Sequence, residues 1–128
     1  MLWSNNRIYC SNHFIKMKKK LTGGQQAKIF AAKVFIKIYK VDDTLYNVVV
    51  IVGPALFGSF FHSNTDTVWS RVEDPQQFRL LEMMALTNVF EITMERLIEI
   101  LVLQVQHNEF ELLNNRPIGR EKYQNPSS

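Results

Sequence analysis

The stretch from Leu45 to Phe61 is the most apolar part of the sequence, and its length and breaks restrict the possible folds. It is seventeen residues long, whereas a helix that crosses a bilayer needs about 20 apolar residues. Gly53, Pro54 and Gly58 also interrupt it, and two aspartates precede it. We therefore expect this stretch to form buried segments of a folded core, and we do not expect a membrane as a partner.

β-branched residues dominate the first half of this stretch and favour strands. Their stiff side chains suit a pleated strand better than a helix, so Leu45–Val52 is predicted as a strand. A second strand, Ala55–His62, follows the Gly53-Pro54 break, because proline removes a ladder donor. Apolar and polar residues alternate again in Thr67–Val72, which predicts another short strand.

Residues 28–41 fit two periodicities. Lys33, Lys37 and Lys40 share one face of a helical wheel, yet apolar residues also alternate through this stretch. The turn-type cluster Val41-Asp42-Asp43-Thr44 favours a hairpin about Asp42-Asp43, although strand and helix both stay open for residues 28–41.

Asp74-Pro75 is the clearest helix start in the chain, with an acidic N-cap and proline at the first helical position. The predicted helical region runs over 75–113, either continuous or interrupted near Thr87-Asn88. Its second half is amphipathic, with Glu91, Glu95 and Glu99 on a polar face.

These patterns predict an α+β fold, a small antiparallel β-meander of about four strands followed by a long or kinked C-terminal amphipathic helix. The expected organisation is a basic N-terminal arm over residues 1–24, a single α+β domain over 25–113 and a flexible C-terminal tail over 114–128.

Charge is divided unevenly along the chain. Residues 1–41 hold nine of the fifteen Lys and Arg residues and none of the twelve Asp and Glu residues. Such an arm can bind anions, or the two halves can neutralise each other within the fold or between subunits. The arm also has the charge bias of a mitochondrial presequence, although it is rich in lysine rather than arginine.

Residues that carry chemistry are sparse. Cys10 is the single cysteine, which favours a reducing intracellular setting. Cys10 and His13 would give only two of the four ligands of a structural zinc site. Gly23-Gly24 lacks the Gly-Lys-Ser/Thr sequence of a phosphate-binding loop and is interpreted as a hinge. We therefore expect that the protein is not an enzyme and that it binds no metal and no cofactor.

The sequence thus favours a non-enzymatic interaction or scaffolding protein, a subunit of a homo- or hetero-oligomer. Ile92 and Leu103 flank the main apolar seam of the helix and would leave apolar surface exposed on a single chain. The candidate partner interface is Phe90, Ile92, Met94, Leu97, Leu101 and Leu103.

The alternative is a nucleic-acid-binding protein, in which lysines neutralise the phosphates of RNA or DNA and nearby aromatic side chains stack on bases. The candidate lysines are Lys16, Lys18, Lys19, Lys20, Lys33 and Lys37.

Overall fold

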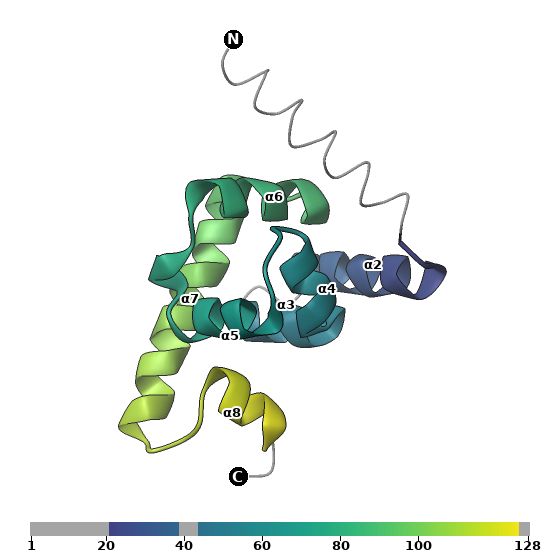
Figure 1. The fold of residues 1–128 in the computed structure, drawn as a ribbon. Helices are drawn as coiled ribbons and strands as arrows, with labels where there is room; N and C mark the ends of the chain where they lie inside the picture. Colours follow the sequence, from purple (N-terminus) through teal and green to yellow (C-terminus); the bar gives the residue numbers. More distant parts are fainter. Residues whose placement is uncertain (1–20, 39–43, 126–128) are drawn as a thin grey trace.

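Helices form all the regular structure of residues 21–38 and 44–125, which are the residues that the computed structural model describes (Figure 1). The predicted α+β fold with its β-meander is therefore wrong, since these residues contain no strand. In chain order the elements are α2 (Gly23–Ile38), α3 (Leu45–Val52), α4 (Pro54–Ser59), α5 (Thr65–Glu73), the 3-10 helix η1 (Pro75–Gln77), α6 (Leu80–Phe90), α7 (Met94–Leu113) and α8 (Gly119–Gln124).

The predicted strand Leu45–Val52 is helix α3, and the spacing of its buried residues explains why. Leu45, Val48, Val49 and Val52 stand at i, i+3, i+4 and i+7, and each is at most 2% exposed. A β-branched residue loses no more than about 0.7 kcal/mol of helix propensity. Burial of such a side chain stabilises the fold by about 1.5–3 kcal/mol, so packing outweighs propensity here.

The other predicted strands are helical for the same reason. Ile29, Ala32 and Ile36 are the buried residues of α2, at i, i+3 and i+7, and α5 buries its apolar residues at helical spacing too. The predicted strand Ala55–His62 is occupied mainly by α4, which begins with Pro54 at its first turn. The predicted turn at Asp42-Asp43 lies outside the described residues.

Helix α2 begins at the Gly23-Gly24 pair, which lies within the helix rather than in a separate hinge. Thr22 and Gln25 cap this end reciprocally: the Gln25 N–H donates to Thr22 Oγ1 (3.1 Å), and the Thr22 N–H donates to Gln25 Oε1 (2.9 Å). This is a capping box, which satisfies donors that a helix N-terminus leaves free.

The predicted helical region 75–113 is helical but divided differently. Pro75 opens only the short η1, and the main break lies at 91–93 rather than at Thr87-Asn88. Glu91 ends α6 in the left-handed conformation (φ 55°), and Thr93 Oγ1 caps α7 by accepting from the Arg96 N–H (3.1 Å). Thr87 stays within α6, where its hydroxyl donates to the Met84 carbonyl (2.7 Å).

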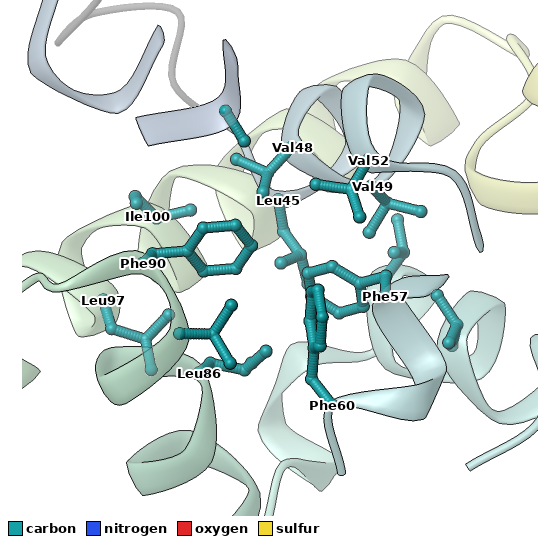
Figure 2. Close-up of a cluster of buried hydrophobic side chains, with 14 of the residues drawn as sticks. Leu45, Val48, Val49, Val52, Phe57, Phe60, Leu86, Phe90, Leu97 and Ile100 are labelled. Carbon is teal, nitrogen blue, oxygen red and sulfur yellow. The ribbon is translucent and has the colours of Figure 1, made fainter. Parts of the chain in front are cut away.

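The core lies where α3, α4, α6 and α7 meet (Figure 2). Helix α7 is the longest of the described helices and contacts α3, α5, α6 and η1. Phe57 of α4 and Phe90 of α6 stack with ring centroids 6.2 Å apart, and Phe60 meets the edge of Phe90 at 5.8 Å. Aromatic pairs of this geometry add to the free energy of burial, so this cluster fastens α4 to α6.

Ion pairs and aromatic contacts join the outer helices to this core. Arg71 of α5 donates to both carboxylate oxygens of Glu82 on α6, at 3.2 and 3.3 Å. Burial raises the pKa of Glu82, but the hydrogen bonds from Arg71 and from the Arg79 backbone N–H outweigh it and lower the pKa overall. The region expected to be a tail contains α8, whose Tyr123 ring lies 4.9 Å from that of Trp69.

Two buried amides on α7 connect the ends of two other helices. Gln104 Oε1 accepts from the Tyr46 N–H in the first turn of α3 (2.7 Å), and Gln104 Nε2 donates to Asn108 Oδ1 (2.8 Å). Asn108 Nδ2 in turn donates to the Val72 carbonyl in the last turn of α5 (2.9 Å). Helix ends leave such backbone groups without partners inside the helix, so this amide relay satisfies them where water has little access.

Replacing Gln104 with methionine should therefore destabilise the protein. The change keeps the volume but leaves the Tyr46 N–H and the Asn108 amide without their partner, which costs about 1–3 kcal/mol per buried group. Urea unfolding measures the loss. Gln106→Met, an exposed position on the same helix, is the control and should change stability by less than about 0.5 kcal/mol. Equal stability of the two variants would contradict the role given to the relay.

Gly58 marks a close approach between α4 and the loop that follows it. A Cβ at this position would lie 2.5 Å from the Ser63 carbonyl oxygen and 3.0 Å from Val68 Cγ2. The Ser63 N–H donates to the Gly58 carbonyl (2.9 Å), so the loop cannot easily move away.

We expect Gly58→Ala to destabilise the fold by about 1–3 kcal/mol, the usual range for overpacking. Thermal unfolding followed by circular dichroism measures this loss. Gly24→Ala is the matched control, since the nearest atom to a Cβ there is 3.9 Å away, and it should be neutral or slightly stabilising. A Gly58→Ala protein as stable as the control would show that the loop at Ser63 shifts to make room for the added methyl group.

Candidate interaction surface

The lysines predicted to bind nucleic acid are only partly within the described residues. Lys16, Lys18, Lys19 and Lys20 lie outside them. On α2, Lys33 Nζ lies 2.8 Å from Glu91 Oε2, so its charge is already paired within the chain.

Lys37 is exposed near the end of the same helix. Phe35, an aromatic side chain near these lysines on α2, is partly buried and packs against the hydrophobic core.

The residues predicted to form a partner interface lie mostly inside the single chain. Phe90, Leu97 and Leu101 are 3%, 3% and 8% exposed, and all three belong to the core cluster. Ile92 and Met94 are partly buried and pack against that cluster. The apolar seam recognised in the sequence therefore contacts the chain's own helices, and the exposed apolar side chains are different ones.

Helix α2 carries an exposed row of apolar side chains on the face opposite its buried one. Phe30, Val34 and Ile38 stand at i, i+4 and i+8 and are 67%, 37% and 63% exposed. We call these three residues the α2 stripe. Lys28 and Lys37, both exposed, lie on either side of it on the helical wheel. Helix α2 is thus apolar on two faces with cations between them.

Helix α7 presents a second surface, apolar and acidic. Ile98 and Val102 are 45% and 47% exposed one turn apart, and Leu113 at the helix end is 84% exposed. Glu95 and Glu109 are exposed and share this face, since they are three, four or seven residues from the nearest of these apolar side chains. We call these five residues the α7 outer face.

An open cavity of about 410 Å³ lies between α7, α8 and the start of α3. Lys122 Nζ is 3.2 Å from His107 Nε2 and 4.5 Å from the centroid of the Tyr46 ring. Burial and the Lys122 charge lower the pKa of His107, so the neutral imidazole can accept a hydrogen bond from the ammonium. The lining residues are Thr44, Asn47, Leu103, Gln106, His107, Phe110 and Lys122, which include the predicted interface residue Leu103.

The lowered pKa of His107 predicts a pH dependence of stability. In the folded chain the proton binds less readily than to an ordinary histidine of pKa 6.5. The contribution of neutral His107 to the free energy of unfolding is therefore complete above about pH 6.5. It is lost as the pH falls through the lowered pKa of His107 in the folded chain.

Unfolding by urea at several pH values should show this loss, and His107→Gln should flatten the curve in that window. The Glu111 carboxylate opposes the shift, so Glu111→Gln should steepen the dependence. A wild-type curve that stays flat below pH 6.5 would contradict the assignment.

Within the described ranges no three His, Cys, Asp or Glu side chains cluster as metal ligands would. No helix in these ranges has both the length and the apolar content needed to cross a bilayer. Comparison of the chain with protein-family models, with curated proteins and with solved structures finds no match.

Proposed function

We propose that this protein is a non-enzymatic interaction or scaffolding subunit that buries exposed helix faces against another protein chain. The observation that carries the proposal is the amount of apolar surface left uncovered. Among the described residues, the large apolar side chains that are more than half exposed are Phe30, Ile38, Leu80, Leu81, Phe110, Leu112 and Leu113. Soluble monomers rarely leave extended apolar patches in water, and larger ones mark interaction sites.

The placement of these side chains adds support. Helix α2 buries Ile29, Ala32 and Ile36 in the core and exposes the α2 stripe on the opposite face. A helix that is apolar on two faces is ordinarily covered on both. We therefore assign the second face of α2 to contact with another chain.

The alternative, nucleic-acid binding, has less support from the described residues. Lys33 is paired with Glu91, and Phe35 packs against the core. The α2 stripe occupies the exposed face of α2 and the exposed Lys28 and Lys37 only border it, whereas a phosphate-binding surface would present clustered cations there. We therefore favour a protein partner.

Sedimentation of the intact chain over a wide range of concentration tests the proposal. We expect association that weakens when one apolar pair is replaced by glutamine: Phe30 with Ile38, Leu80 with Leu81, or Ile98 with Val102. Each of these side chains is at least 45% exposed, so each pair should change the free energy of unfolding by less than about 1 kcal/mol.

A chain that stays monomeric at every concentration, and that crosslinks to no protein in cells, would contradict the proposal. Association that none of the three pairs affects would contradict the assignment to exposed helix faces.

A further inference from the structure

The exposed face of α2 that carries the stripe and the α7 outer face are complementary in charge. Lys28 and Lys37 border the α2 stripe, and Glu95 and Glu109 belong to the α7 outer face. None of these four side chains forms an ion pair with another described residue. By contrast, Lys33 is already neutralised by Glu91. The free charges on α2 are therefore positive, and those on the α7 outer face negative.

The two surfaces also match in form. Phe30, Val34 and Ile38 make an i±4 row about 12 Å long, at 1.5 Å per residue. The α7 outer face, from Glu95 to Leu113, extends over about 27 Å and can receive the whole row. Rows of this kind on two helices interdigitate in the commonest modes of helix packing.

The same two surfaces do not meet within one chain. Figure 1 shows α2 and α7 along different sides of the bundle, with α3 and α6 packed against α2. Near the start of α7, Arg96 Nη2 donates to the Ile36 carbonyl on the buried face of α2 (3.0 Å), away from the α2 stripe. The stripe of one molecule is thus available to the outer face of another.

We propose that the α2 stripe of one copy of this chain packs on the α7 outer face of a second copy, with Lys28 and Lys37 facing Glu95 and Glu109. This inference rests on the proposed function and names its partner. The apolar rows supply the affinity of the contact, and the charges select the pairing of unlike faces over that of like faces.

Charge exchange tests the pairing. One variant carries Lys28→Glu with Lys37→Glu, and the other carries Glu95→Lys with Glu109→Lys. Each variant alone presents like charges on both surfaces, so we expect its self-association to weaken by at least about tenfold in sedimentation experiments. An equal mixture restores unlike faces and should recover association. Glu121→Lys on α8, also exposed, is the control for a charge change elsewhere and should have no effect.

The outcomes separate this inference from the proposed function. If the mixture fails to recover association, the pairing of these faces is wrong, although association through other faces would still support an interaction protein. If association is lost only in the variant with Lys28→Glu and Lys37→Glu, and its binding to anionic vesicles or to RNA falls as well, the stripe serves an anionic surface instead. A wild-type chain that is monomeric throughout would overturn the inference. Circular dichroism of both variants checks that they stay folded.

Discussion

The amide relay of Gln104 and Asn108 is the interaction on which the arrangement of helices depends. Gln104 is 1% exposed and Asn108 is 5% exposed, both in the second half of α7. Buried amides are costly unless their donors and acceptors are used. Here they bond to the Tyr46 N–H of α3 and the Val72 carbonyl of α5. All these hydrogen bonds form together only when α3, α5 and α7 have the relative placement seen in the structure. Apolar packing would tolerate small shifts of these helices, whereas the relay fixes their register.

The sequence marks the boundary at Gly53-Pro54 correctly, but its signal for the type of the two flanking elements is misleading. Gly53, with φ 97°, does separate two elements, and Pro54 does begin the second. The β-branched run before them favours strands by propensity, which is a weak preference compared with burial. The i, i+3, i+4, i+7 spacing of Leu45, Val48, Val49 and Val52 is the stronger signal, because it matches one buried helical face. A run that is apolar at nearly every position hides this spacing until the core is known.

The candidate interaction surface was predictable from the sequence only in part. The sequence places Glu95 on a solvated face of a helix, and the structure exposes it on α7. The α2 stripe was harder to see, since Val34 and Ile38 also fit a strand alternation. The buried seam of Leu97 and Leu101 looks from the sequence like a partner interface, because a single amphipathic helix does not show which other helices of the chain will cover it.

The position of the relay also bears on how the chain folds during synthesis. The groups that it satisfies belong to Tyr46 and Val72, whereas both of its amides come from residues 104 and 108, near the end of the described chain. A ribosome that has made α3 and α5 has yet to make their polar partner. The apolar side chains of α3 and α6 that pack against α7 also lack their partner until α7 has emerged. In that interval the nascent chain exposes apolar surface of the kind that chaperones bind.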